Sequence, residues 1–293
     1  MTSGIAILTW NRLPVLKTFL DSLQASGLSE RYPIAVFDDQ SLEDDTCGFL
    51  GGSFVGHRSD LKADEWTTST ASAPSTTIRA FLGTENLGVS GNSNRALRFA
   101  WEQGWDHICL CNDDLVVSGD FVRFYAEAHS KLGVGMWCYC GLTDESHRWV
   151  TIPYNDYKIK MIPRMTGAMM SITRDVIKNI GYFDTRFGKF GEEHCDYTNR
   201  ARFSGFINLG GQEQQCLDVD QDFLKHQDTP SSISAKAKPR LDAEAAAAIQ
   251  EASCRYATTS HYRPFRLRWP RFAGTLGQSC GIRVDDLTGY ALF

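Results

Sequence analysis

The chain has 293 residues, of which 42% are hydrophobic and 22% are charged, and its formal net charge at pH 7 is −5. This length suits one large α/β domain with an added segment, or two modest domains. The negative charge argues against a protein that coats nucleic acid with its whole surface.

The first residues show no basic segment followed by an apolar run, and no stretch approaches about 18 consecutive apolar residues. We therefore expect a cytoplasmic protein without a transmembrane segment. Nine cysteines, an odd number, favour reduced thiols in that compartment. The pairs Cys109/Cys111 and Cys138/Cys140 are spaced too closely for a usual zinc site, so we expect them to act as small buried hydrophobes.

The first 110 residues alternate between expected strands and helices. The expected strands cover residues 4–9, 33–37, 77–82 and 106–110, and the expected helices begin at Pro14 and at Ser90. Residues 60–77 are rich in Thr and Ser and are typical of a polar insertion. This alternation predicts right-handed crossovers and a mostly parallel sheet.

The second half is less regular. We expect a strand at 135–141, a strand interrupted by glycine at 161–173, and helices at 174–180, 193–203 and 243–252. Residues 255–283 hold six arginines, interleaved with aromatics, and no acidic residue. That composition suits a surface for DNA, another polyanion or an anionic membrane, and it equally suits a segment that packs over an acidic domain.

Two adjacent acids, Asp113 and Asp114, follow Asn112 at the end of an apolar run. Parallel α/β sheets place ligand sites beyond the carboxyl ends of their strands, and oxygen-rich clusters there suit divalent cations that bridge phosphates. A solvated turn uses the same residue types. Both interpretations stay open on this motif alone.

Several short motifs occur along the chain in one order. They are residues 9–12 (TWNR), 38–41 (DDQS), 86–94 (NLGVSGNSN), 112–114 (NDD), 166–168 (TGA), 181–184 (GYFD) and 192–197 (EEHCDY). This order resembles that of GT-A fold, family 2-like glycosyltransferases, over roughly residues 4–230. The resemblance implies an α/β fold with a Rossmann-like, mostly parallel sheet and flanking helices, in a glycosyltransferase domain at 1–230 with a C-terminal accessory region at 231–293.

The resemblance also implies an inverting enzyme that uses a nucleotide-sugar donor, expected to be a UDP-sugar, with Mn²⁺ or Mg²⁺. At the end of the second strand, Asp39, or Asp38 in second place, could accept a hydrogen bond from the imide N–H of a pyrimidine base. Asp38 could instead hold the loop. Thr9 and Arg12 follow the first strand, where they could reach ribose or phosphate, although Arg12 could also simply pair with a nearby acid.

The remaining contacts with the donor and its sugar are expected from three places. Glycines near the start of a helix let backbone amides approach a ligand closely. In similar enzymes an asparagine-rich turn contacts the nucleoside, and a later glycine lines the acceptor side of the sugar. The residues concerned are Asn86, Gly88 and Asn94, then Asn112 and Asp113, then Gly167.

Asn112 departs from the first Asp of the Asp-x-Asp motif of the family, which makes Asp114 the expected main metal ligand. His226 lies where similar enzymes supply a late histidine to the metal, although a lone histidine is often a surface or capping residue. The cation would neutralise the leaving diphosphate.

The segment from Glu192 to Asp196 aligns with the Glu-Asp-x-Asp pattern of the family in two ways. Glu193 falls in the site under both, so it is the expected catalytic base, with Asp196 and His194 in support. The alternative is a set of acids placed against a helix dipole.

Trp137, Trp149 and Tyr154 are candidates to stack on sugar or acceptor rings, or to lie in the core. Three functions follow as hypotheses. The first is transfer to a saccharide or cell-envelope glycan, the second is transfer to a hydroxylated base in DNA held by the arginine-rich tail, and the third is a nucleotide-sugar-binding module without catalysis.

Overall fold

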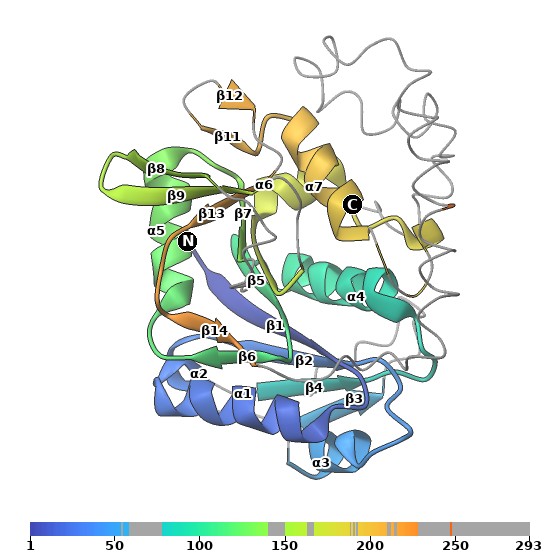
Figure 1. Cartoon of the computed structure of the whole chain (residues 1–293). Coiled ribbons are helices and arrows are strands. Elements are labelled where there is room, and N and C mark those ends of the chain that lie inside the picture. Colours follow the sequence, from blue (N-terminus) through green and yellow to red (C-terminus); the bar gives the residue numbers. More distant parts are fainter. Residues whose placement is uncertain are drawn as a thin grey trace.

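The computed structural model describes residues 1–53, 55–58, 78–139, 150–162, 167–187, 189, 191, 193–209, 212–213, 216–227 and 247. Its central sheet has seven strands in the order β3-β4-β2-β1-β5-β10-β7 (Figure 1). These are β1 (Ser3–Thr9), β2 (Ile34–Asp38), β3 (Val55–Arg58), β4 (Ile78–Leu82), β5 (His107–Asn112), β7 (Met136–Tyr139) and β10 (Met169–Thr173). Strands β3, β4, β2, β1 and β5 run parallel, and β10 is antiparallel to both of its neighbours. The expected α/β fold with a mostly parallel sheet is confirmed.

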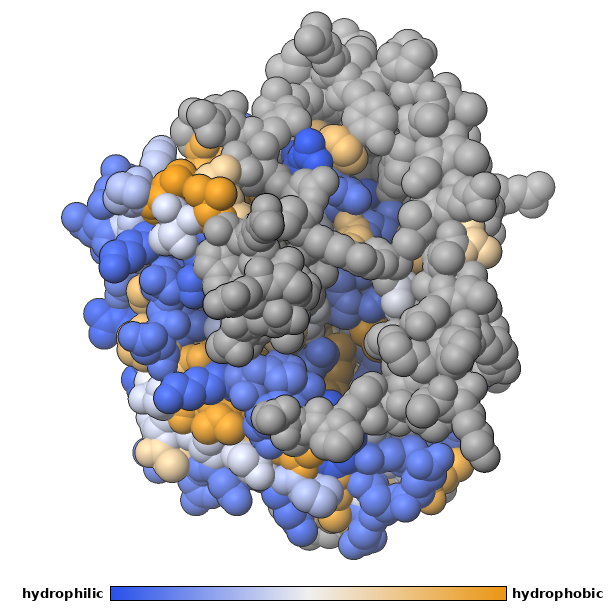
Figure 2. All heavy atoms as spheres, viewed as in Figure 1, coloured by the Kyte–Doolittle hydropathy of each residue, from blue (hydrophilic) through white to orange (hydrophobic). Residues whose placement is uncertain are grey.

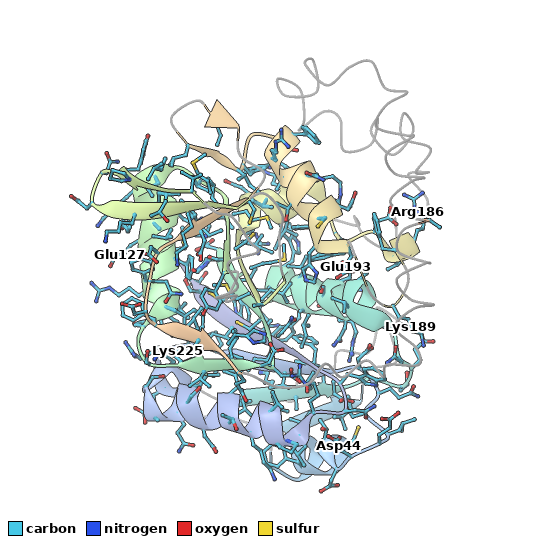
Figure 3. All side chains as sticks on the ribbon, in the orientation of Figure 1. Asp44, Glu127, Arg186, Lys189, Glu193 and Lys225 are labelled. Carbon is cyan, nitrogen blue, oxygen red and sulfur yellow. The ribbon has the colours of Figure 1, made fainter. Side chains whose placement is uncertain are left out.

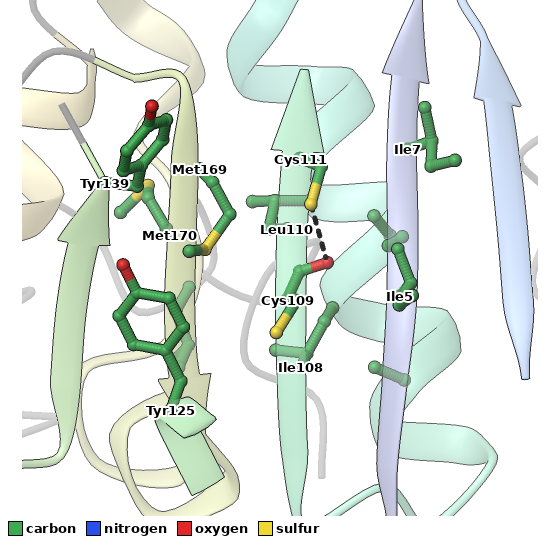
Figure 4. Packing of buried hydrophobic residues seen from close by; sticks show 14 of the residues in the cluster. Ile5, Ile7, Ile108, Cys109, Leu110, Cys111, Tyr125, Tyr139, Met169 and Met170 are labelled. Carbon is green, nitrogen blue, oxygen red and sulfur yellow. Dashed lines mark hydrogen bonds between the residues drawn. The ribbon is translucent and has the colours of Figure 1, made fainter. Parts of the chain in front are cut away.

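The strands in the middle of the sheet are continuous apolar runs because both of their faces are covered. Strand β2 is buried at every position, and β1 at every position after Ser3. Figure 4 shows Ile5 and Ile7 of β1 beside Cys109 and Cys111 of β5. Cys109, Cys111 and Cys138 are buried free thiols, as expected, while Cys140 lies outside the described residues.

The helices are α1 (Leu13–Ala25), α2 (Leu28–Arg31), α3 (Thr46–Ser53), α4 (Gly88–Glu102), α5 (Phe121–Leu132), α6 (Arg174–Ile180) and α7 (Glu193–Phe203), with a 3₁₀ turn, η1 (Thr185–Phe187). Helix α1 is amphipathic and buries Leu16, Phe19, Leu20 and Leu23. On the face drawn in Figure 2, the described residues along its lower edge, where α1 lies in Figure 1, are mostly hydrophilic. Within the described residues, no helix is long and apolar enough to span a bilayer.

Helix α5 was not among the expected elements, although its two ends carry ordinary sequence signals. The carboxylate of Asp120 accepts a hydrogen bond from the amide of Arg123 at 3.0 Å, which caps the N-terminus. Gly133 ends the helix in a left-handed conformation, with φ of 67°. The helix expected at 243–252 and the insertion at 60–77 lie outside the described residues, apart from residue 247.

Three small sheets complete the described part. Strands β13 (Cys216–Val219), β9 (Tyr157–Ile162) and β8 (Val150–Tyr154) form one, β6 (Leu115–Val117) pairs with β14 (Leu224–His226), and β11 (Asn208–Leu209) pairs with β12 (Gln212–Glu213). The prediction of one interrupted strand at 161–173 is wrong. Met161 pairs with Leu217 in the small sheet, whereas Met169 pairs with Cys111 in the central sheet, so the two halves have different partners.

The strand order places a ligand site. The chain adds β2 on one side of β1 and later returns to add β5 on the other side. The connections diverge there, and open α/β sheets bind ligands at such a switch point, beyond the carboxyl ends of the strands. Helix α4, which leads into β5, packs on β1, β2 and β5, and so supports this edge (Figure 1).

Candidate active site

Residues from β1 and β5 meet at the switch point. Strand pairing sets Leu8 opposite Asn112, so the residues that follow both strands emerge side by side. Thr9 Oγ1 donates a buried hydrogen bond to Asp113 Oδ2 at 2.7 Å. Arg12 Nη1 lies 3.1 Å from Asp113 Oδ1 and 3.0 Å from Asp114 Oδ2. The structure therefore brings four of the expected site residues, Thr9, Arg12, Asp113 and Asp114, into one hydrogen-bonded cluster.

The two adjacent acids of this cluster have different electrostatic environments. Burial raises the pKa of Asp113 to about 7, although Arg12 and Thr9 stabilise its anion. Burial also raises the pKa of Asp114, but hydrogen bonds and charges from His226 and Arg12 outweigh it, and the net pKa is lowered. Asp114 is therefore the carboxylate held as an anion at neutral pH.

His226 reaches the cluster through a short antiparallel pairing. Strand β14 pairs with β6 so that His226 stands opposite Leu115, next to Asp114. His226 Nε2 lies 3.3 Å from Asp114 Oδ2, and this contact raises the pKa of His226. Gln227 locks the pairing, because its amide donates to the carbonyl oxygen of Asp114 at 2.7 Å.

These residues fit a divalent cation. Asp114 Oδ1 is buried and has no hydrogen-bond partner among the described residues, and His226 supplies a nitrogen beside the other carboxylate oxygen. The described residues contain no group of three or more His, Cys, Asp and Glu side chains that could hold a metal. A cation here would therefore draw most of its oxygen ligands from phosphates and water, as Mg²⁺ usually does.

Asp38 and Asp39 take different positions at the end of β2. Asp38 is fully buried, and its carboxylate accepts hydrogen bonds from the amide and hydroxyl of Ser41 and from the thiol of Cys47. It therefore holds the loop, which is the alternative role that the sequence left open. The carboxylate of Asp39 accepts hydrogen bonds from the backbone amides of Leu87 and Gly88, both at 2.8 Å.

The Asp39 carboxylate thus ties the end of β2 to the start of α4. Burial raises the pKa of Asp39 to about 6, against the opposing effect of the two amides and Arg95. Arg95, which was not among the expected site residues, is 3% exposed and donates to the carbonyl oxygen of Asp38 at 2.9 Å. It places a buried positive charge beneath the two acids.

Helix α4 begins at Gly88, two residues before the expected start. Gly88 has φ of 72°, and a Cβ at this position would come within 2.2 Å of the Lys189 backbone, so only glycine fits. Asn94 therefore lies inside the helix and not at its start, and it pairs with the backbone of Phe183. Asn86 is half-buried just before the helix.

Glu193 begins α7 above α4 (Figure 3). It is 3% exposed, and His194 Nδ1 lies 2.5 Å from its Oε1. The other edge of the His194 ring lies against Gly167, where a Cβ would come within 2.5 Å of Nε2. The carbonyl oxygen of Ala168, the residue after Gly167, accepts a hydrogen bond from the amide of Asn112 at 3.0 Å. This contact sets Gly167, and with it the Glu193–His194 pair, beside the end of β5.

Asp196 is directed elsewhere. Its carboxylate pairs with Arg200 at 2.8 Å, one turn along α7. Arg200 also donates to the carbonyl oxygens of Ile180 and Tyr182, at 2.7 and 2.8 Å. This buried arrangement holds the loop after α6, and the supporting catalytic role expected for Asp196 stays a prediction.

Several other expectations have clear outcomes. Trp137 is 0% exposed and belongs to the core, which confirms the core alternative for this residue and excludes sugar stacking. Tyr154 is partly buried against the core. Thr166, Trp149, Glu192 and the tail at 255–283 lie outside the described residues.

Asn11, which belongs to the motif at residues 9–12 but was given no role of its own, holds a loop in place. Its side-chain oxygen accepts hydrogen bonds from the backbone amides of Leu42 and Glu43, at 2.8 and 3.1 Å. Its backbone amide donates to Ser41 Oγ at 2.7 Å. Its φ of 52° is a conformation that asparagine tolerates better than most residues. An asparagine two residues after an apolar strand was the available signal.

Comparisons with solved structures identify the architecture. The chain superposes on a crystal structure of GalNAc-T7 with UDP, GalNAc and Mn²⁺ with a TM-score of 0.59 and 12% identity, over 98% of this chain and 57% of that one. It also matches crystal structures of S. aureus TarS in complex with UDP and with UDP-GlcNAc. Both have TM-scores of 0.50 and 13% identity, over 98% of this chain and 85% of TarS. The chain has the GT-A fold.

Sequence comparisons add less to this GT-A assignment. No protein-family model matches the chain. Over 132 residues it is 26% identical to the uncharacterized proteins Rv1525 of Mycobacterium tuberculosis and Mb1552 of Mycobacterium bovis, which is 42% of this chain. The match spans 50% of the length of these relatives.

Proposed function

We propose that this protein is a glycosyltransferase that moves a sugar from a nucleoside diphosphate to an acceptor hydroxyl with the help of a divalent cation. One observation carries the proposal. Arg12, Asp113, Asp114 and His226 come from three separate segments and converge beyond the carboxyl end of β5. A cationic side chain, a buried anion and an imidazole at a switch point suit a metal-bound diphosphate.

The donor is proposed to be a UDP-sugar. Its base would lie by Asp39, Asn86 and the start of α4, at the end of β2. A bound cation would offset the charge that develops on the leaving diphosphate. Arg12 and Thr9 would hold Asp113 and Asp114 in place for that task. GalNAc-T7 and TarS, which share the fold, were crystallised with UDP or UDP-sugar, which supports this choice.

The acceptor hydroxyl is proposed to approach from the side of Glu193, His194 and Gly167. In an inverting reaction the hydroxyl attacks the anomeric carbon from the face opposite the diphosphate, so one group must take its proton. The Glu193–His194 pair supplies such a group beside the end of β5. We propose a family 2-like inverting enzyme that acts in the cytoplasm on a saccharide or cell-envelope glycan.

The experiment is a donor screen on the full chain. Release of nucleoside diphosphate is measured for UDP-, GDP- and dTDP-sugars, with Mn²⁺, with Mg²⁺ and with excess chelator. We expect turnover with a UDP-sugar that needs one of the two cations. Binding of a donor without turnover under any condition, including a panel of saccharide acceptors, would support a binding module and overturn the enzymatic proposal.

A further inference from the structure

The pair formed by Glu193 and His194 departs from the two-acid pattern that the sequence resembles at this point. His194 Nδ1 is 2.5 Å from Glu193 Oε1, so its N–H donates to the carboxylate. In a neutral imidazole one ring nitrogen carries the proton and the other accepts one. Glu193 therefore selects the form of His194 in which Nε2 is the acceptor.

The position of Nε2 is fixed by Gly167. Only the absence of a Cβ at Gly167 lets the ring edge lie there, because a Cβ would come within 2.5 Å of both Cε1 and Nε2. Phe183 meets the other side of the ring edge-on, with 5.7 Å between centroids. The carbonyl oxygen of the neighbouring Ala168 accepts a hydrogen bond from the amide of Asn112, so Gly167, against which Nε2 packs, is one residue from a backbone contact with the end of β5.

The side chains of His194 and Glu193 differ in their exposure to solvent. The side chain of His194 is 13% exposed, and that of Glu193 is 4% exposed. Glu193 Oε1 is bound to His194, and Oε2 has less than 1 Å² of exposed surface. Burial raises the pKa of Glu193, but His194 and the amides of Gly191 and Glu193 outweigh it and lower the net pKa. A carboxylate stabilised as an anion is a weak proton acceptor at neutral pH.

We propose that Nε2 of His194 takes the proton of the acceptor hydroxyl, and that Glu193 is a positioning residue that orients His194. The inference rests on the proposed function. The O–H bond of the acceptor breaks and its proton moves to Nε2, while an oxygen electron pair forms the new bond to the anomeric carbon. The bond from that carbon to the diphosphate oxygen breaks, and its electron pair leaves with the diphosphate. The Glu193 carboxylate stabilises the imidazolium that results.

The kinetic test compares His194→Gln and Glu193→Gln in the full chain, with Glu127→Gln on the distant helix α5 as a matched surface control (Figure 3). We expect His194→Gln to lower kcat by about 100-fold or more with little change in donor KM, and Glu193→Gln to lower it by about tenfold. The control should match the parent. A nearly active His194→Gln with an inactive Glu193→Gln would overturn the inference and make Glu193 the base.

Two further measurements distinguish the loss of a proton acceptor from misfolding of the variant. Added imidazole should restore part of the activity of His194→Ala, because the small base can occupy the vacated space. Nitrogen-15 NMR of the parent should show the proton of His194 on Nδ1, and Glu193→Gln should lose this preference. A proton on Nε2 in the parent, or no rescue of a folded His194→Ala, would contradict the assignment. Absence of parent turnover with every donor would overturn the proposed function, and the inference with it, whereas an active parent with an active His194→Gln would overturn the inference alone.

Discussion

Asn94 and Phe183 exchange two hydrogen bonds. Asn94 Nδ2 donates to the carbonyl oxygen of Phe183 at 2.9 Å, and the amide of Phe183 donates to Asn94 Oδ1 at 2.8 Å. The Phe183 ring stacks on Tyr197, with 4.2 Å between centroids, and also meets His194. One asparagine of α4 therefore connects the helix beneath the donor side to α7, which carries the proposed proton acceptor.

Replacing Asn94 should weaken this connection. Asn94→Ala leaves the amide and carbonyl of Phe183 without their partner, and an unsatisfied buried polar group costs about 1–3 kcal/mol. We expect urea unfolding to show a loss of about 2 kcal/mol. Asn179→Ala, which removes one exposed hydrogen bond within α6, serves as the control and should change stability much less. Equal losses in the two variants would show that the contact with Phe183 adds nothing.

The metal role proposed for Asp114 predicts a loss of turnover in Asp114→Asn. The amide keeps the size of the side chain but removes the charge that would hold the cation, so we expect kcat to fall about 100-fold or more, a change of about 3 kcal/mol in the barrier. Asp21→Asn, at an exposed position of α1, is the matched control. Circular dichroism should show an unchanged fold in both. Full activity of Asp114→Asn, or of the parent in excess chelator, would refute the role.

The ion pairs of α7 and α4 predict losses of stability of different size when one partner is neutralised. Asp196–Arg200 and Arg98–Glu102 both join residues one turn apart at 2.8 Å, but the first pair is buried and the second is about one-third exposed. Asp196→Asn should cost about 3 kcal/mol of unfolding free energy, because Arg200 stays buried without its counter-charge. Glu102→Gln should cost less than about 0.5 kcal/mol. If Asp196→Asn folds with parent stability but is inactive, its role is catalytic.

A pH dependence of stability follows from His129. Its two nitrogens contact the carbonyl oxygen of Val134 and the hydroxyl of Ser171, and burial lowers its pKa from 6.5 to about 4. Between these values the unfolded chain binds a proton that the folded chain does not bind, so stability falls as pH drops below about 6.5. The full loss is about 3 kcal/mol.

The pH effect is measured as a difference between variants. Asp113 and Asp39, whose pKa values are raised, change stability in the opposite direction and would obscure the profile of the parent alone. We expect His129→Gln to be less stable than the parent near neutral pH and to lose less of its stability on acidification. Parallel profiles for parent and variant would show that His129 does not titrate differently on folding.

The arginine-rich tail remains a prediction from sequence. Replacing Arg263, Arg266, Arg268 and Arg271 by Gln should weaken binding to DNA or another polyanionic acceptor. The slope of log affinity against log salt should fall by about one unit for each lost phosphate contact. Donor turnover should be unchanged. If the parent itself shows no salt-dependent binding, the tail has no such partner.

The sequence by itself determined most of the local elements and the types of residue that follow the central strands. The apolar run of β5 predicted a buried strand, because a continuous apolar strand implies a sheet covered on both faces. The acids after it left a ligand site and a solvated turn as open alternatives. The helix at Arg174–Ile180 and the helix at Glu193–Phe203 were predicted with their correct bounds. These features depend on short-range chemistry that a single segment contains.

Only the tertiary structure decided which groups face one another. The strand pairing of β14 with β6 brings His226 to Asp114, and the Asp196 carboxylate pairs with the buried Arg200. Asp38 and Asp39 are adjacent in sequence, yet one faces Ser41 and the other faces the start of α4. Such differences arise from burial and from partners far along the chain. Because desolvation and long-range pairing set the charge and direction of a side chain, no motif read alone could assign them.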